Sequence, residues 1–175
     1  MLNGIEEKEI RENVINSLFD KQNLIGVSTG FADLDKITKG LKRGHLIVLG
    51  GETGIGKSML ATTLSINVAK SGHNVLYLDL ENGRDEIYHR LLTNWFNLDP
   101  GYFENEENKE QVDKFLDILE DKIDYWGIDD LISFGYVDNP IKAVMGIIQQ
   151  GGRNPRRKPR LIVVDPLQAL ERQTD

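Results

Sequence analysis

The chain has 175 residues, of which 39% are hydrophobic, which is sufficient for one domain with its own core. Its formal net charge of −7 excludes a chain that binds nucleic acid through overall positive charge, and the absence of cysteine excludes disulfides and thiolate metal sites. The N-terminus is acidic and no long apolar run follows it, so we expect a cytoplasmic protein without a signal peptide or membrane span.

The first segment, residues 1–22, is charged and carries apolar residues at roughly helical spacing: Ile5, Ile10, Val14, Leu18 and Phe19. This pattern predicts an amphipathic helix over residues 4–20 outside the main core. Such a helix could pack on its own domain or dock on a neighbouring subunit, and the sequence leaves both options open. The remaining residues, 23–175, are predicted to form the domain itself.

A turn and a short helix near residues 32–38 precede the most informative stretch of the chain. The apolar run 46–49 predicts the first core strand, and it leads directly into a glycine-rich loop. The helix that follows is expected over residues 57–70 and ends at Ser71-Gly72, a natural helix stop.

The loop matches the pattern G-x-x-x-x-G-K-[ST] with Gly51, Gly56, Lys57 and Ser58. Glycines allow several backbone N–H groups to approach one phosphate chain, and the following helix adds its positive N-terminal end. Lys57 can reach the β- and γ-phosphates of a nucleotide, and Ser58 offers a hydroxyl to Mg²⁺. The predicted nucleotide-binding residues are Gly51, Glu52, Thr53, Gly54, Ile55, Gly56, Lys57, Ser58 and Met59.

The second strand is predicted over residues 74–80, which gives a parallel strand–helix–strand unit with a right-handed crossover. Glu81 closes this strand, and residues 84–96 are expected to be helical. Apolar positions spaced along one face predict a further helix over residues 104–125, and the run 131–134 predicts a third strand.

The last part of the predicted domain begins with a helix from Pro140 to Gln150, which Asn139 caps. The β-branched run 161–164 predicts a fourth, buried strand that closes on Asp165. The basic loop 153–160 between them enters the amino end of this strand, so we expect a solvated loop away from the ligand face rather than a nucleic-acid site.

The chemistry of the predicted sheet gathers at the carboxyl ends of its strands, where open parallel sheets bind ligands. Asp165 comes at the end of an apolar strand. A carboxylate in this position can hold Mg²⁺ through a water molecule, on the opposite side of the ion from Ser58. Glu81 ends the neighbouring strand and could polarise the water that attacks the γ-phosphate. Asp79 is expected to point away from this site, so Glu81 is the better catalytic candidate, together with Lys57.

These motifs carry a resemblance. Residues 26–58 with their Thr-Gly-x-x-x-Leu-Asp sequence, Leu80-Glu81, and Asp165-Pro166-Leu167-Gln168 look like the RecA-like motor domain of DnaB-family hexameric replicative helicases. The resemblance covers residues 20–170 and implies an α/β P-loop NTPase fold with a mainly parallel sheet flanked by helices. It also implies that Gln168 supports the Mg²⁺ aspartate and that residues 4–20 resemble the linker helix that docks on the next subunit.

By that resemblance, the activity would be Mg²⁺-dependent ATP hydrolysis at a subunit interface, driving a hexameric ring along single-stranded DNA in DNA replication. The chain ends soon after the strand that closes on Asp165, which corresponds to the family's Walker B strand. In the family, the DNA-contacting loops, the γ-phosphate sensor and the basic finger come after this point. We therefore expect a partial motor domain that binds nucleotide weakly and hydrolyses ATP poorly or not at all by itself.

Two other functions stay open. The chain could belong to a RecA-like ATPase that is not a helicase, such as a recombinase paralogue or a clock-type regulator, which the residues after Asp165 would distinguish through the presence or absence of DNA-contacting loops. It could also be a non-enzymatic module that occupies subunit contacts of such a ring through residues 4–20, which a pull-down with and without residues 1–20 would test.

Overall fold

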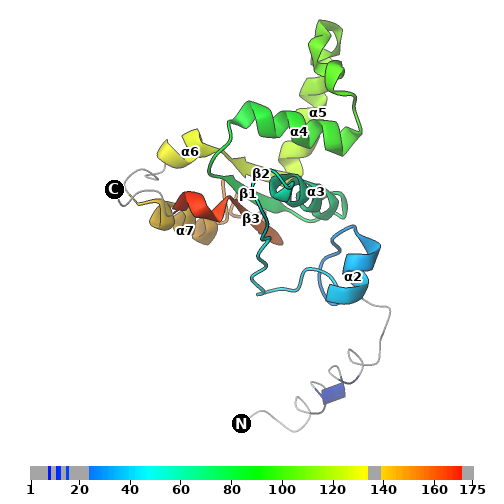
Figure 1. The fold of residues 1–175 in the computed structure, drawn as a ribbon, viewed down its shortest axis with the longest axis vertical. Coiled ribbons are helices and arrows are strands. Elements are labelled where there is room, and N and C mark those ends of the chain that lie inside the picture. Colours follow the sequence, from blue (N-terminus) through cyan, green and yellow to red (C-terminus); the bar gives the residue numbers. More distant parts are fainter. Residues whose placement is uncertain (1–7, 9–10, 13–14, 16–23, 134–138, 171–175) are drawn as a thin grey trace. The chain divides into compact units, whose positions relative to one another are not determined.

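The structure is a computed structural model that describes residues 8, 11–12, 15, 24–133 and 139–170 (Figure 1). Of the helix predicted over residues 4–20, only residues 8, 11–12 and 15 are described, and all four are helical. The boundary predicted after residue 22 lies outside the described residues. The chain divides into two compact units, Met1–Ile47 and Val48–Asp175. Among the described residues, no helix is long and apolar enough to cross a membrane.

The described part of the first unit is organised around a buried carboxylate. Helix α2, Ala32–Thr38, has the predicted bounds, and a backbone bridge pairs Val27 with Leu41. Asp35 accepts hydrogen bonds from the Thr29 N–H (2.9 Å), the Thr29 hydroxyl (2.8 Å) and the Ser28 hydroxyl (2.7 Å). In the Thr-Gly-x-x-x-Leu-Asp sequence, the aspartate therefore stabilises the preceding turn by holding it against α2 through hydrogen bonds.

The second unit contains a three-stranded parallel sheet. Its strands are β1 (Val75–Asp79), β2 (Ile123–Trp126) and β3 (Leu161–Asp165), in the order β2-β1-β3. The predicted α/β class with a mainly parallel sheet is thus confirmed. The central strand β1 is buried along its whole length because helices cover both of its faces.

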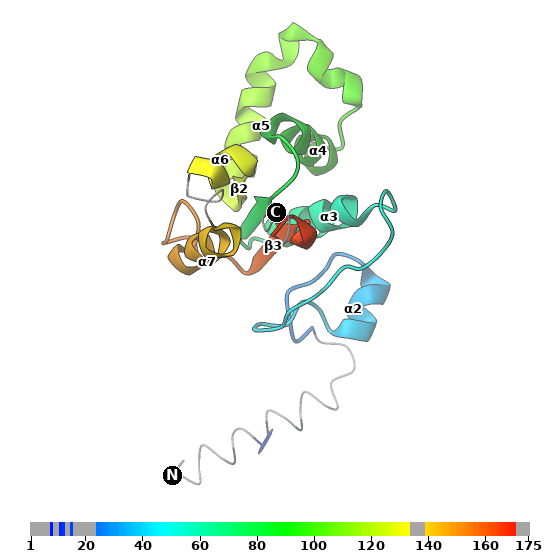
Figure 2. The same cartoon turned by 60° about the vertical axis from the view of Figure 1, so that its left-hand side comes forward.

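The helices of this unit are α3 (Lys57–Lys70), α4 (Arg84–Phe96), α5 (Lys109–Lys122), α6 (Ile128–Ser133) and α7 (Pro140–Gln150), with short 3-10 turns η1 (Pro100–Glu104), η2 (Glu106–Asn108) and η3 (Leu167–Leu170). Figures 1 and 2 show the strands side by side, with α3 and α7 packed against the sheet. The predicted bounds of α3, α4 and α7 agree with the structure, and the predicted cap of α7 is present, since the Asn139 side chain accepts the Lys142 N–H.

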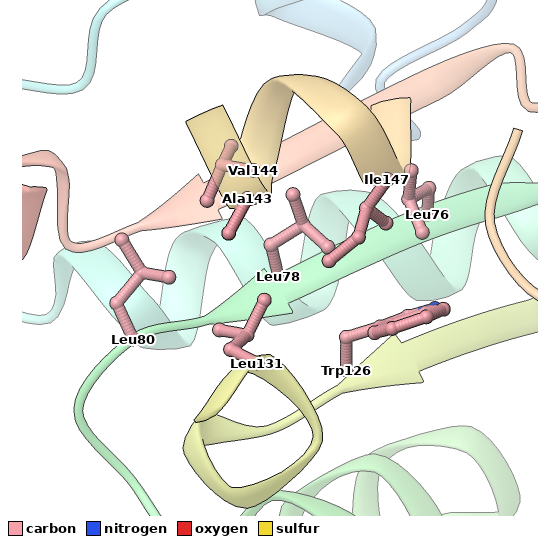
Figure 3. Packing of buried hydrophobic residues seen from close by; sticks show 8 residues of the cluster. All are labelled: Leu76, Leu78, Leu80, Trp126, Leu131, Ala143, Val144 and Ile147. Atoms are coloured by element: carbon pink, nitrogen blue, oxygen red, sulfur yellow. The ribbon is translucent and has the colours of Figure 1, made fainter. Parts of the chain in front are cut away.

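The core between β1 and α7 is shown in Figure 3. Leu76 and Leu78 alternate along β1 toward α7, whose residues Ala143, Val144 and Ile147 are buried against them. This packing leaves Tyr77 and Asp79 on the other face of the strand, on the side of α3. The face of β1 that carries polar side chains is therefore the face covered by α3, the helix that follows the glycine-rich loop.

The strand predicted over residues 46–49 is absent. These four residues have no regular secondary structure, and Leu46 and Val48 are 91% and 72% exposed. Within the described residues, β3 pairs with β1 only, so the run 46–49 has no strand beside it to bury its apolar side chains. The prediction was wrong because an apolar, β-branched run becomes a strand only where a partner edge and a covering layer receive it.

The third strand was also predicted in the wrong place. Residues 131–134 were expected to be a strand, but Leu131 to Ser133 end helix α6, with Leu131 buried and Ile132 47% exposed. The strand is instead Ile123–Trp126, which the prediction had joined to the preceding helix. The helical spacing of apolar residues in α5 continues into Ile123, so the sequence pattern does not mark the boundary.

Candidate functional site

The glycine-rich loop 51–56 leads directly into α3. Gly54 and Gly56 adopt positive φ angles of 82° and 102°, a backbone conformation that side chains disfavour, and a Cβ at either position would meet no atom within 4 Å. Gly56 is the N-cap of α3 and supplies no side-chain cap to the first N–H groups of the helix. The loop and helix therefore present uncapped N–H donors on an exposed surface, as a phosphate site requires.

Lys57 is held on this loop. Its ammonium group donates hydrogen bonds to the carbonyl oxygens of Gly51 (2.9 Å) and Glu52 (2.8 Å). The positive charge thus lies over the loop, within the ring of residues predicted to hold the phosphates. Met59, the last of the predicted binding residues, is 52% exposed on the first turn of α3.

Asp165 lies at the carboxyl end of β3 and is buried, with 9% of its surface exposed. Its register partner on β1 is Asp79, and the Leu80 N–H donates to the Asp165 carbonyl oxygen (2.8 Å), which extends the pairing by one residue. Paired residues on adjacent parallel strands point to the same face of the sheet. Asp79 is therefore a neighbour of Asp165 at the edge where the sequence had placed Asp165 and Glu81.

Asp79 was expected to point away from the site, and this expectation was wrong. Side chains two positions apart in a strand point to the same face of the sheet. Asp79 and Glu81 are two positions apart, so the strand period gives no reason to expect them on opposite faces. The buried Asp79 carboxylate accepts the N–H groups of Glu81 (3.0 Å) and Asn82 (2.8 Å), which shapes the turn after β1. Burial first, and the charge of Asp165 in addition, raise the pKa of Asp79, whereas these N–H bonds act to lower it.

Glu81 lies in this turn directly after β1 and is exposed. Its backbone N–H is held by the Asp79 carboxylate, and the preceding residue, Leu80, pairs with Asp165. The position predicted for Glu81 at the strand end agrees with the structure, and its catalytic role remains a prediction. Gln168 lies in η3, two residues beyond the cis bond between Asp165 and Pro166, and is exposed.

Tyr77 is a residue that the sequence analysis did not single out. It is fully buried in β1, and its hydroxyl donates a hydrogen bond to Asp165 Oδ2 (3.0 Å). Burial first, then the charge of Asp165, raise the pKa of Tyr77 far above its ordinary value, so the hydroxyl stays protonated as a donor. Because the two residues are 88 positions apart, no local spacing in the sequence could have revealed the contact.

The side chain of Thr62 links this buried pair to the loop helix. Its hydroxyl donates to the Ser58 carbonyl oxygen (2.8 Å) and also lies within hydrogen-bonding reach of the Tyr77 hydroxyl. Thr62 is fully buried in α3. Ser58 and Asp165, the two residues predicted to hold Mg²⁺, are thereby connected through the protein interior.

The donor set fits a nucleotide with its divalent cation. The loop supplies N–H groups and a lysine for phosphate oxygens, while Ser58 and Asp165 supply the oxygen atoms that Mg²⁺ prefers. Among the residues that the structure describes, no group of three histidine or acidic side chains could hold a metal ion by itself. A cation at Ser58 and Asp165 would thus share its coordination with nucleotide phosphates and water.

The basic loop lies at the amino ends of the strands, as predicted, since the Arg160 N–H donates to the Asn74 carbonyl oxygen (2.8 Å) just before β1. Two of its arginines also form ion pairs on the neighbouring elements, Arg153 with Asp124 (2.9 Å) and Arg157 with Asp121 (2.8 Å). The loop is thus anchored to the end of α5 and to β2, in addition to being solvated.

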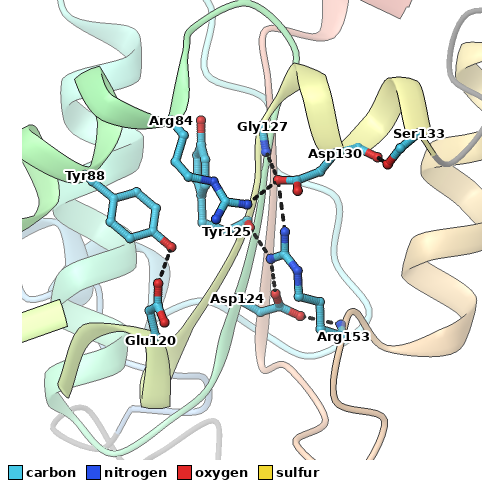
Figure 4. A network of polar contacts seen from close by, with 9 residues as sticks. All are labelled: Arg84, Tyr88, Glu120, Asp124, Tyr125, Gly127, Asp130, Ser133 and Arg153. Carbon is cyan, nitrogen blue, oxygen red and sulfur yellow. Dashed lines mark hydrogen bonds and ion pairs between the residues drawn. The ribbon is translucent and has the colours of Figure 1, made fainter. Parts of the chain in front are cut away.

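Arg153 belongs to a polar network around Asp130, shown in Figure 4. Asp130 Oδ2 accepts hydrogen bonds from the Arg84 guanidinium (2.7 Å) and the Gly127 N–H (3.0 Å), and it forms an ion pair with Arg153 (2.9 Å). The Arg153 guanidinium also stacks on the Trp126 ring. A cavity of about 310 Å³ is lined by Arg84, Arg153 and Arg157 together with Glu120, Asp121 and Asp124. Because these charges neutralise one another and join β2, α4 and α6, we interpret the network as one that holds β2 and α6 in place.

The comparisons with known proteins agree with this geometry. The family described as "DnaB-like helicase C terminal domain" matches residues 26–175. Replicative DNA helicase DnaB of Haemophilus influenzae is 27% identical over 114 residues, covering 65% of this chain and 24% of the relative. The DNA repair and recombination protein RadB of Methanobrevibacter smithii is 25% identical over 154 residues, covering 78% of this chain and 65% of the relative.

A solved structure, the ATPase Domain of G40P, shares the fold with a TM-score of 0.59 at 15% identity, covering 92% of this chain and 70% of that one. The chain spans between 16% and 24% of the length of the first curated replicative helicases it matches. The family match covers most of the described residues and includes the glycine-rich loop, Glu81 and Asp165. The resemblance predicted from the motifs is confirmed: the chain belongs to the family of DnaB-like helicase C-terminal domains.

Proposed function

We propose that this chain binds Mg²⁺–ATP on the glycine-rich loop and forms the nucleotide-binding part of a helicase motor domain. The proposal is supported by two features of the same compact unit. Lys57 lies on the glycine-rich loop at the N-terminus of α3, and the buried Asp165 ends strand β3. Together they supply the phosphate donors and the carboxylate that phosphoryl transfer in P-loop enzymes uses.

The roles of the residues follow from their chemistry. Backbone N–H groups of residues 51–59 and the Lys57 ammonium would bind the phosphates, and Ser58 and Asp165 would hold Mg²⁺, Asp165 through water. The bound cation would offset the charge that develops on the phosphate oxygens. Glu81 would orient and deprotonate the attacking water, a role that suits an exposed carboxylate on a fixed turn. Gln168 would support Asp165 from η3.

The proposed wider function is ATP-driven movement of a hexameric ring along single-stranded DNA during replication, and the support for it is the similarity to proteins named as replicative DNA helicases. A ring ATPase completes its site with a basic residue from the next subunit, which is worth orders of magnitude in rate. We therefore expect this chain alone to bind nucleotide and to hydrolyse it slowly.

The second candidate is a recombination ATPase. It is favoured by the match to RadB, which spans 78% of this chain, whereas the match to the Haemophilus influenzae helicase spans 65%. Both candidates need the same phosphate site, so nucleotide binding does not distinguish them. Strand displacement on a forked duplex by the protein would favour the helicase, and single-strand-stimulated ATP hydrolysis without displacement would favour the recombination ATPase.

The test of the shared core of the proposal is calorimetric titration with ADP and ATP in the presence of Mg²⁺. We expect micromolar binding by the parent chain and at least about a tenfold weaker affinity for Lys57→Ala, since a charged hydrogen-bond donor to phosphate is lost. The matched control is Lys158→Ala, which removes the same charge from the exposed basic loop and should bind as the parent does. Equal affinity of the parent and Lys57→Ala, or no binding by a folded parent, would falsify the phosphate site.

A further inference from the structure

Strand β1 carries polar side chains in a position where a purely apolar strand would pack equally well. Tyr77 and Asp79 are both fully buried on the face of the sheet that the α7 core does not cover. Burying a hydroxyl and a carboxyl group costs free energy unless hydrogen bonds offset it. Their presence at the edge that holds Asp165 therefore calls for a role at that edge.

The contact between Tyr77 and Asp165 defines this role. A buried carboxylate at a strand end can rotate between several orientations unless its oxygens are held. The Tyr77 hydroxyl donates to Oδ2 (3.0 Å), which leaves Oδ1 as the oxygen available to a metal-bound water. The tyrosine ring is in turn fixed by the ring of Tyr125, at a centroid distance of 6.1 Å, and by the polar contact with Thr62.

We propose that Tyr77 is a positioning residue that holds Asp165 in the orientation needed for Mg²⁺ binding beside Ser58. It acts through Asp165 and does not touch the nucleotide. Thr62 joins the same arrangement from α3, because its hydroxyl donates to the Ser58 carbonyl oxygen and faces the Tyr77 hydroxyl. The inference rests on the proposed Mg²⁺–nucleotide site and adds to it the group that orients the carboxylate.

The test is the magnesium dependence of ADP binding by the full chain, with Tyr77→Phe compared with the parent. The substitution keeps the ring and removes only the hydroxyl. We expect the Mg²⁺ concentration at half-saturation to rise about tenfold, the effect typical of losing a group that orients a metal ligand. The affinity for ADP measured in EDTA should stay unchanged, because the loop that binds the phosphates is untouched.

The matched control is Tyr88→Phe, which also removes a hydroxyl bonded to a carboxylate, that of Glu120 at 2.9 Å, but on α4. This variant should titrate as the parent does. Asp165→Asn should raise the half-saturating Mg²⁺ concentration at least as much as Tyr77→Phe does, and the double variant should be no weaker than Asp165→Asn alone, since Tyr77 acts only through Asp165.

The outcomes separate the two proposals. A parent that binds ADP equally well with and without Mg²⁺ overturns the magnesium site and the role of Tyr77 with it. A magnesium-dependent parent with an unshifted Tyr77→Phe overturns the role of Tyr77 alone, as does a Tyr77→Phe variant whose affinity falls equally in EDTA.

A second measurement keeps the proposal testable if Tyr77→Phe does not fold. A fluorotyrosine placed at position 77 retains the hydroxyl, and its ¹⁹F resonance should move when Mg²⁺ is added to the ADP complex. The same label at position 88 is the control and should not move. An unmoved resonance at position 77 would count against the proposal.

Discussion

At the scale of single residues, the sequence identified the groups of the candidate site that lie in a recognisable local pattern. Lys57, Ser58 and Asp165 belong to motifs and were placed where the structure has them. Tyr77 and Asp79 lie inside a predicted strand, where a polar residue carries no signal until its partner is known. Their partners come from β3 and from the turn after β1, and only folding brings these together.

One prediction at this scale concerns Asp79. Asp79→Ala removes the acceptor of the Glu81 and Asn82 N–H groups, and we expect it to lower the free energy of unfolding by about 2 kcal/mol. Asp79→Asn keeps a carbonyl oxygen for the same bonds and removes a buried charge, so it should cost less. Urea denaturation of the two variants measures the difference. Equal losses would show that the acceptor does not matter.

At the scale of elements, the sequence predicted those helices whose ends carry their own stop signals. The predicted bounds of α3 and α7 agree with the structure because glycine or a Pro-containing cap lies at their boundaries. The sequence predicted β2 as the end of a helix, because Ile123 continues the apolar spacing of α5. It predicted the end of α6 as a strand, because Leu131 to Ser133 resembles a short strand. Elements that depend on neighbours distant in the sequence were the ones predicted wrongly.

The start of α6 provides a test of such a distant dependence. Asp130 accepts the Gly127 N–H at the N-terminus of α6 and pairs with Arg84 and Arg153. We expect Asp130→Ala to lower the unfolding free energy by about 1–3 kcal/mol, since one carboxylate serves three donors. Asp129→Ala removes the same charge from the exposed neighbouring position and should stay within about 0.5 kcal/mol of the parent. Similar losses for both would contradict the network, and thermal denaturation distinguishes the cases.

The turn before α2 has a predictable response to acid. Burial acts to raise the pKa of Asp35, but hydrogen bonds from Ser28 and Thr29 hold this pKa below its ordinary value of 3.8. A lowered carboxyl pKa contributes stability that is complete above the ordinary value and is lost as the pH falls below it toward the lowered pKa. The Thr29 amide proton, bonded to Asp35 Oδ1, should therefore keep its chemical shift and slow exchange from about pH 6 to about pH 4 and lose both in stronger acid. In Asp35→Asn the same amide should show no such transition.

At the scale of the whole molecule, the parallel sheet explains why a site can be assembled from distant segments. Parallel strands β1 and β3 bring residues 79 and 165 to one edge, and α3 delivers the glycine-rich loop to the same side of β1. The motifs predicted Asp165 at this edge, whereas Asp79 was expected to point away from it. What they could not predict is which apolar run finds a place in the sheet, because that depends on the whole set of partners and not on the run itself.

The segment 46–49 allows this difference to be measured. As a strand in the sheet it would resist proteolysis, whereas in the structure it has no regular secondary structure and Leu46 is 91% exposed. We expect chymotrypsin at low dose to cut first after Leu46 or Leu49, at the junction of the two compact units, and mass spectrometry to show a fragment that retains α3 and the sheet. The double variant Leu46→Thr/Leu49→Thr should slow this cut without lowering the melting temperature, because neither side chain is buried. A first cut elsewhere, or a large loss of stability in the double variant, would show that residues 46–49 are paired in solution and that the sequence pattern predicted their strand correctly.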